Sequence, residues 1–224
     1  VLRGAVPAIL AGNTYVLKHA PNVMGSAYLL GELKLKKGDR IAIMMPNCLQ
    51  YPVAVFGALR AGLTVVNVNP LYTAREMEHQ FNDSGAKALI CLANMAHLAE
   101  QVVPKTGVKT VIVTEVGDML PTFKRLLVNF VIKHVKKMVP AYNLPQAVKL
   151  NDALAKGRGQ SFSEANPSNA DIAVLQYTGG TTGVAKGAML TNRNLIANMQ
   201  QASAWISASG IEMGKEWIIT ALPL

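Results

Sequence analysis

Short apolar runs alternate with amphipathic segments between residues 40 and 118. Four runs rich in Ile, Val and Leu predict buried β-strands, at 40–45, 63–69, 86–92 and 109–114. Three segments between them repeat apolar residues at helical spacing and predict α-helices, at 49–62, 73–85 and 94–103. Strands and helices that alternate in this way are typical of a parallel sheet covered by helices. The pattern therefore predicts an α/β fold with a mostly parallel sheet.

The segment 73–85 carries its own start and stop signals. Thr73 is suited to the N-cap position, and Glu76 lies three residues later, where a capping box places Glu or Gln. Gly85 follows the segment's last residues and is suited to the left-handed conformation that ends many helices. These signals support a helix at this place independently of its apolar pattern.

A longer amphipathic stretch follows at 120–139. One helical face carries apolar side chains and a histidine, namely Phe123, Leu127, Phe130, Val131, His134, Val135 and Met138. Another face carries four basic side chains, namely Arg125, Lys133, Lys136 and Lys137. Two interpretations stay open. The stretch lies on an anionic membrane surface with its lysines at the headgroups, or it packs its apolar face on the protein core.

The last part of the chain begins with a polar connector at 156–170, rich in Gly, Ser and Asn. After it the pattern predicts a strand at 171–178, a helix at 191–206 and a strand at 216–222. No segment of the chain repeats another.

The composition indicates a folded protein with a sizeable core. Half of the 224 residues are hydrophobic and the mean hydropathy is +0.24, which argues against disorder. The 22 Lys and Arg exceed the 13 Asp and Glu, so the formal net charge is +9. Such a surplus favours phosphate, nucleic acid or an anionic membrane as partner. Because no aromatic platform or recognition motif accompanies the charge, we do not expect nucleic-acid binding.

The cysteines and the hydropathy profile bear on location. Cys48 and Cys91 lie far apart and belong to no CxxC pair, so they predict buried thiols in a reducing compartment. No arrangement of His and Cys predicts a metal site. No apolar run approaches the roughly 18 residues that a membrane-spanning helix needs. We expect a cytoplasmic protein, with the inner face of the cell membrane as a second place if 120–139 binds lipid.

The stretch YTGGTTGVAKGAMLTNRN, residues 177–194, is the strongest candidate for chemistry. Its glycines let backbone N–H groups converge on an anion, its threonines add hydroxyl donors, and Lys186 adds a positive charge for phosphoryl oxygens. The stretch is not a Walker A loop, because Ala185 precedes the lysine and Gly187 follows it. The alternative is a tight turn before a hairpin, with no ligand.

The same stretch resembles the phosphate-binding signature of the adenylate-forming enzymes, [ST]-[SG]-G-[ST]-[TS]-G-x-[PA]-K-G. The segments LQYTGGTTGVAKGAMLT and VKKMVPAYNLP narrow the resemblance to bacterial long-chain fatty acid–CoA ligases, and it extends over residues 33–224. It implies that these residues are part of the large N-terminal AMP-binding domain. It also implies that a loop holds the ATP phosphates, formed by Thr178, Gly179, Gly180, Thr181, Thr182, Gly183, Lys186 and Gly187.

The resemblance further implies ATP, Mg²⁺ and CoA as reactants, with a fatty acid as the acyl substrate. The family joins the fatty-acid carboxylate to AMP, releases pyrophosphate, and then transfers the acyl group to CoA. Asn192 departs from the family, in which many members have histidine at this position, so a titrating role there is not expected. The family's remaining active-site motifs belong beyond Leu224, and we therefore expect this chain to be inactive alone.

The first 32 residues follow another pattern. AVPAILAGNTYVLKHAPNVMGSA resembles the NAD-binding region of aldehyde dehydrogenases, through Ala8, Gly12, Asn13, Thr14, Val16 and Lys18. The resemblance implies that Lys18 would meet the adenosine ribose of NAD. The alternative is an ordinary strand and helix whose Gly-Asn turn imitates the motif. No dehydrogenase nucleophile or base follows, so we interpret residues 1–32 as a stray segment.

The sequence thus predicts ATP-dependent activation of long-chain fatty acids through an acyl-adenylate. Two alternatives remain. One is a non-catalytic fragment that binds membranes peripherally, and the other is a piece of an NAD-dependent aldehyde dehydrogenase.

Overall fold

The computed structural model describes residues 33, 35–157, 166–180 and 183–208. The dehydrogenase-like segment with Lys18 and the strand predicted at 216–222 lie outside the described residues.

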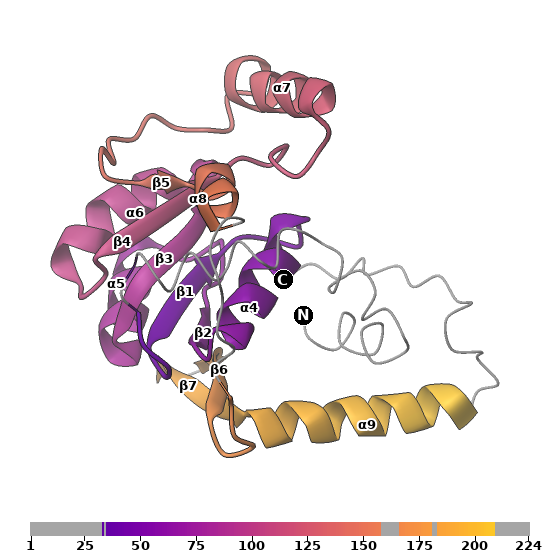
Figure 1. Ribbon diagram of the computed structural model, residues 1–224. Helices are drawn as coiled ribbons and strands as arrows, with labels where there is room; N and C mark the ends of the chain where they lie inside the picture. The colour runs from indigo at the N-terminus through magenta and orange to yellow at the C-terminus, as the bar shows by residue number, and fades with distance from the viewer. Residues whose placement is uncertain (1–32, 34, 158–165, 181–182, 209–224) are drawn as a thin grey trace.

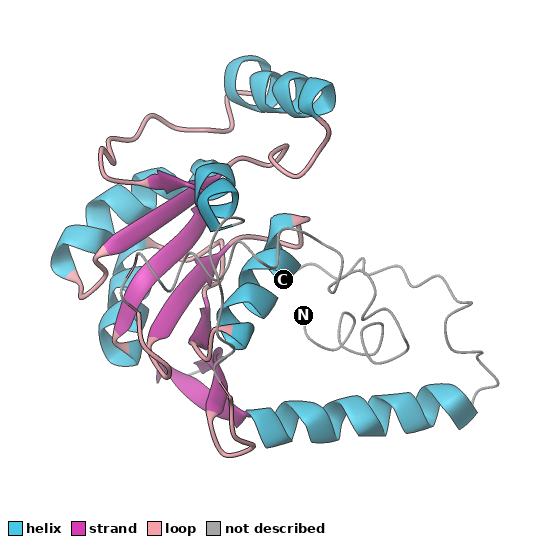
Figure 2. Cartoon of the chain, in the orientation of Figure 1, coloured by secondary structure: helices cyan, strands magenta, loops and turns pink. Residues whose placement is uncertain are grey.

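A single seven-stranded sheet, with the strand order β5-β4-β3-β1-β2-β6-β7, forms the centre of the described structure (Figure 2). The strands are β1 Arg40–Met44, β2 Thr64–Asn67, β3 Ala86–Leu92, β4 Thr110–Thr114, β5 Val148–Lys149, β6 Ile172–Gly180 and β7 Gly183–Thr191. Every neighbouring pair is parallel except β6 and β7, which form an antiparallel hairpin. The mostly parallel α/β fold that the apolar pattern predicts is confirmed.

Helices cover both faces of this sheet. The α-helices are α4 Gln50–Arg60, α5 Ala74–Ser84, α6 Ala96–Val102, α7 Thr122–Phe130, α8 Leu150–Gly157 and α9 Asn192–Ala208. Three short helices accompany them within the described residues, the 3₁₀ turns η2 Ala93–Met95 and η3 Val103–Lys105, and the π-helical turn η4 Val131–Val135. Figure 1 shows α4 on one side of the sheet and α5 and α6 on the other.

Two apolar cores follow from this layering, one on each face of the sheet. Alternate side chains of β1 separate between them: Ile41 and Ile43 pack with α4 and α8, whereas Ala42 and Met44 pack with α5 and α6. All four are at most 1% exposed. A parallel strand buried on both faces needs apolar residues at every position, which is why β1 has a continuous apolar run after Arg40.

The predicted start and end of α5 are confirmed. The Thr73 hydroxyl accepts a hydrogen bond from the Glu76 amide, and the Glu76 carboxylate accepts one from the Thr73 amide. The helix ends at Gly85, whose φ of 62° lies in the left-handed region. Helix α9 begins in a similar way: the Thr191 amide donates to Asn194 Oδ1, and the Asn194 amide donates to Thr191 Oγ1.

Three sequence predictions differ from the structure. The stretch 120–139 is helical only over 122–135, and the backbone turns at Lys137, whose φ is 51°. Strand β5 and helix α8 arise where no element was predicted, because two residues of strand and eight of helix are too short for a periodic signal. Strand β7 was predicted as a loop, because its glycines mask its pairing with β6.

No helix in the described part of the chain is long and apolar enough to cross a membrane.

Candidate functional site

The glycine-rich stretch forms the end of the β6–β7 hairpin. Thr178 lies directly opposite Lys186, and Gly180 lies opposite Gly183, with an irregular register between Thr178 and Gly180. Residues directly opposite each other in an antiparallel pair point to the same face. The Thr178 hydroxyl and the Lys186 ammonium group therefore project from one face, and both side chains are exposed.

Tyr177 holds the two strands together at the base of this loop. It lies opposite Gly187, and a Cβ atom added at Gly187 would be 3.0 Å from the Tyr177 ring. A side chain at position 187 would therefore crowd the Tyr177 ring, and glycine avoids this. The Tyr177 hydroxyl donates a 2.5 Å hydrogen bond to Asp83 on α5. Burial, reinforced by this carboxylate, raises the pKa of Tyr177, so the phenol stays protonated and donates.

A cavity of about 250 Å³ lies beside the hairpin, at the carboxyl ends of β1, β2 and β6. Its wall holds a chain of side-chain hydrogen bonds: the Tyr51 hydroxyl donates to Asn67 Oδ1, and Asn67 Nδ2 donates to Gln176 Oε1, each at 2.9 Å. Burial raises the pKa of Tyr51 to about 12. In open α/β sheets, ligands bind outside the carboxyl ends of the strands, and this cavity and the hairpin loop both lie there.

The structure places most of the predicted phosphate-binding residues in one hairpin. Thr178, Lys186 and Gly187 are described with their side-chain environment, and Gly179, Gly180 and Gly183 by their backbone alone. Thr181 and Thr182 lie outside the described residues. The ligand-free alternative was a tight turn before a hairpin, whereas the stretch forms the end of the hairpin itself. A hairpin end alone does not call for an exposed lysine opposite an exposed threonine.

Other predicted positions lie elsewhere. Arg125, Lys133, Lys136 and Lys137 belong to α7, η4 and the turn after them, beyond the β5 edge, whereas the hairpin is at the β7 edge (Figure 1). Asn192 has a structural role, because its side-chain amide donates to the Ser168 carbonyl at 2.9 Å. Within the described residues, no three His, Cys, Asp or Glu side chains lie close enough together to hold a metal ion.

Sequence reasoning missed Tyr177, Asp83 and the cavity wall. The signal for the wall was weak but present: Asn67 and Asn69 stand at the end of the apolar run 63–69, where a buried strand would rarely end in two amides without partners. No local pattern pointed to Asp83, because its partner lies 94 residues away in the sequence.

A mostly parallel sheet with a glycine hairpin and a cavity at its carboxyl edge is the arrangement of open α/β proteins that bind a ligand at that edge. The chain matches the family model of AMP-binding enzymes over residues 24–224, and it belongs to that family.

Individual relatives indicate a narrower group within this family. The chain is 57% identical over 199 residues to a long-chain-fatty-acid–CoA ligase of Escherichia coli O157:H7, covering 89% of this chain and 35% of the relative. It is 55% identical over 201 residues to the enzyme of the same name from Haemophilus influenzae, covering 89% and 36%. The chain thus spans about a third of the length of these relatives.

Solved structures agree on the fold. A long-chain-fatty-acid-CoA ligase from Archaeoglobus fulgidus superposes with a TM-score of 0.63 at 27% identity, covering 87% of this chain and 33% of that one. An anthranilate CoA ligase in complex with anthranoyl-AMP superposes with a TM-score of 0.60 at 17% identity, covering 77% and 29%. At that identity the second likeness concerns the fold alone.

Proposed function

We propose that this chain supplies the ATP-phosphate site of an enzyme that activates long-chain fatty acids as acyl-CoA. The observation that carries the proposal is the pairing of Thr178 with Lys186 on one face of a glycine hairpin at the carboxyl edge of the sheet. The family match and the identity to long-chain-fatty-acid–CoA ligases support the same function.

The proposed reaction has two steps. The fatty-acid carboxylate attacks the α-phosphorus of Mg-ATP, the bond to the bridging oxygen breaks, and acyl-adenylate and pyrophosphate form. The thiolate of CoA then attacks the acyl carbon, and AMP leaves with its bonding electrons. A carboxylate is a poor acyl donor, and the first step gives it a far better leaving group. Mg²⁺ enters as part of the nucleotide substrate and neutralises phosphate charge when it is bound.

The residues of the hairpin have distinct roles in this proposal. Lys186 contacts the β- and γ-phosphate oxygens and stabilises the charge that develops on departing pyrophosphate. The Thr178 hydroxyl donates to a neighbouring phosphoryl oxygen, as do Thr181 and Thr182. The glycines allow backbone N–H groups to approach the phosphates closely. Tyr177 does not touch the nucleotide in this scheme, but it positions the hairpin.

Nucleotide binding by this chain tests the proposal. Titration with Mg-ATP should show binding by the wild-type chain, and Lys186→Ala should weaken it about tenfold to a hundredfold, because a charge-assisted hydrogen bond contributes about 1.5–3 kcal/mol. Lys109→Ala is the matched control, since Lys109 is also exposed and lies near the opposite edge of the sheet. Equal affinities of the Lys186→Ala and wild-type chains would contradict the phosphate role. For a longer product that contains this chain, fatty-acid-dependent pyrophosphate release is the second readout.

A further inference from the structure

The glycine-rich loop between β6 and β7 has few side chains of its own to fix its position. Gly179, Gly180 and Gly183 carry none, and glycine has more backbone freedom than any other residue. Strand β7 is also the last strand of the described sheet, so it pairs with β6 alone. The positions of the Thr178 hydroxyl and the Lys186 ammonium group therefore depend on what holds the end of β6.

Two consecutive residues at the end of β6 are held from opposite faces of the sheet. Side chains alternate between the faces along a strand, so Gln176 and Tyr177 point in opposite directions. Tyr177 packs in the core on the side of α5. Gln176 shares the other face with Val174, which packs with α4. Each of the two residues has its own polar partner on its side of the sheet.

On the side of α5 the partner is a carboxylate. The Tyr177 hydroxyl donates to Asp83 Oδ2 at 2.5 Å, across 94 residues of sequence. Asp83 lies in the last turn of α5, and this helix end is itself fixed, because Arg40 Nε donates to the Ser84 carbonyl at 2.8 Å. Asp83 thus joins the base of the loop to a helix end that other contacts hold in place.

On the side of α4 the partner is a chain of two side chains. Tyr51, which is 7% exposed, donates to Asn67 Oδ1, and Asn67 Nδ2 donates to Gln176 Oε1. Asn67 also lies directly beside Gln176 in the parallel pair of β2 and β6. The buried Tyr51 therefore orients Asn67, and Asn67 orients Gln176, which is 109 residues away in the sequence.

We infer that Asp83 and Asn67 are positioning residues for the phosphate loop, one on each face of the sheet. Neither contacts the nucleotide in this scheme: Asp83 acts through Tyr177, and Asn67 acts through Gln176. Apolar contacts alone would hold the strand without fixing its direction, whereas hydrogen bonds weaken steeply when their angles change. The inference rests on the proposed function, because it assigns both residues to the same phosphate site.

Titration of the whole 224-residue chain with Mg-ATP tests the role of Asp83. Asp83→Ala and Tyr177→Phe should each weaken binding about threefold to tenfold, because a displaced loop no longer matches the phosphates. The double variant D83A/Y177F should bind no more weakly than either single variant, because both changes remove one and the same hydrogen bond. Asp83→Asn should bind within about twofold of the wild type, since its amide oxygen still accepts from the phenol.

The same titration tests the role of Asn67. Asn67→Ala should weaken Mg-ATP binding about twofold to fivefold, a smaller loss, because its bond to the exposed Gln176 joins two neutral groups. In D83A/N67A the two losses should multiply, because the two residues lie on opposite faces of the sheet and act through different partners.

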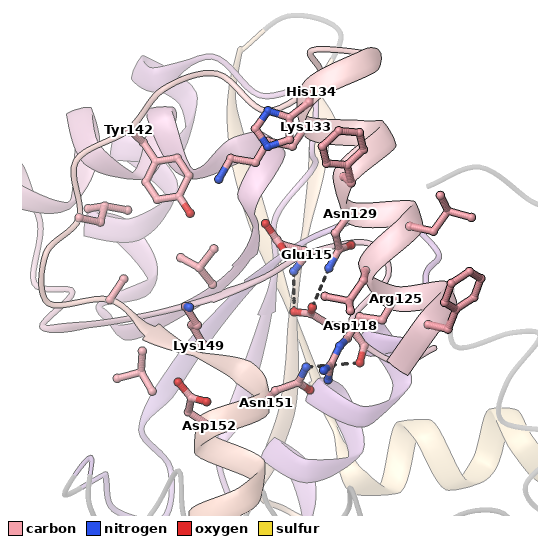
Figure 3. Close-up of a pocket in the computed structure, with 18 residues that line it drawn as sticks. Glu115, Asp118, Arg125, Asn129, Lys133, His134, Tyr142, Lys149, Asn151 and Asp152 are labelled. Atoms are coloured by element: carbon pink, nitrogen blue, oxygen red, sulfur yellow. Dashed lines mark hydrogen bonds between the residues drawn. The ribbon is translucent and has the colours of Figure 1, made fainter. Parts of the chain in front are cut away.

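Helix α7 provides a control region at the other edge of the sheet. No residue of α7 or η4 is buried, so the interpretation that this stretch packs its apolar face on the protein core is wrong for the structure described here. Asn129 forms a polar bridge from α7 to the body, because its Oδ1 accepts from the Gly117 amide at 2.8 Å and its Nδ2 donates to Asp118 at 3.1 Å (Figure 3). The apolar stripe of α7 lines a hollow of about 980 Å³ beside β5, and it consists of Phe123, Leu126, Leu127 and Phe130.

Two control variants separate positioning from a general loss of contacts. Glu78→Ala removes another carboxylate from α5, whose Oε2 lies 3.7 Å from Lys105 Nζ. Asn129→Ala removes the polar bridge of α7, beyond the edge of the sheet opposite the hairpin. Both should bind Mg-ATP as the wild type does. Urea denaturation of every variant shows that it is folded and how much stability it has lost.

Three results would overturn the inference. In the first, Asn129→Ala weakens Mg-ATP binding as much as Asp83→Ala at a similar loss of stability, so that affinity follows stability alone. In the second, Asp83→Ala and Asn67→Ala bind as the wild type does while Lys186→Ala binds more weakly, which would leave the proposed function intact. In the third, Lys186→Ala and the wild type bind equally, which would overturn the proposed function and this inference with it.

Discussion

At the scale of single residues, one side-chain pair links the candidate site to the body of the protein. Tyr177 is 7% exposed, its ring lies against Gly187, and its hydroxyl donates to Asp83. Because Thr178 is the next residue, whatever fixes Tyr177 also fixes the first hydroxyl of the loop. The aromatic ring packs against Gly187, and the hydrogen bond from the hydroxyl to Asp83 sets the orientation of the ring.

We expect Tyr177→Phe to lower the free energy of unfolding by about 1–2 kcal/mol, since a hydrogen bond to a carboxylate is lost while Asp83 stays in contact with water. Urea denaturation measures this change. Tyr142→Phe is the matched control, because Tyr142 is 37% exposed, and it should change stability by less than about 0.5 kcal/mol. Equal effects of the two substitutions would show that the Tyr177 hydroxyl adds no stability.

At the scale of elements, helix ends decide how segments meet. Helix α5 ends at Gly85, whose left-handed backbone turns the chain directly into β3. The guanidinium group of Arg40 lies against this glycine, and its Nε donates to the Ser84 carbonyl at 2.8 Å, so the start of β1 stabilises the last turn of α5. The end of one helix thus sets the position of the next strand.

Gly85→Ala should therefore destabilise the protein by about 1–2 kcal/mol, the cost of a left-handed residue with a Cβ atom, with a further contribution from displacement of Arg40. Thermal or urea unfolding measures the loss. Gly107→Ala provides the control, because a Cβ atom there meets only the Ala86 carbonyl oxygen at 3.7 Å. If Gly85→Ala lowered the free energy of unfolding no more than Gly107→Ala does, the left-handed cap would not be what stabilises the junction between α5 and β3.

At the scale of the whole molecule, stability is distributed unevenly. The central strands β1 and β3 carry side chains with no exposure, among them Ile41, Leu89 and Ile90. Helix α7 has no buried residue, and Asn129 joins it to the body by hydrogen bonds to Gly117 and Asp118. A region with few buried apolar contacts opens locally at low free energy, whereas a buried strand is exposed only when the whole domain unfolds.

Native-state hydrogen exchange should show this difference. Amides of β1 and β3 should exchange only by global unfolding, and those of α7 and η4 at least about a hundredfold faster. Helix α5 is the internal control, because it is of similar length but buries Met77 and Phe81 and carries a capping box. Exchange in α7 as slow as in α5 would show that contacts other than its polar bridge hold the helix down.

The sequence by itself determined the features that depend on neighbouring residues. The four apolar runs became β1 to β4 with bounds within two residues of those predicted, and Thr73, Glu76 and Gly85 take their predicted capping roles. Apolar period and capping are local properties, so a single sequence reports them directly. The glycine motif likewise pointed to the stretch that forms the hairpin loop and to the family that the comparison confirms.

Only the tertiary structure decided which distant residues meet. Strand β1 lies at the centre of the sheet, and Asn67 bonds to Gln176, which is 109 residues away in the sequence. The pattern of apolar and polar residues also could not predict three other features. These are the antiparallel strand β7, the pair of Tyr177 with Asp83 and the exposed stripe of α7. Pairing, burial and exposure depend on the packing of the whole chain, and an amphipathic period shows that a face is apolar without showing what covers it.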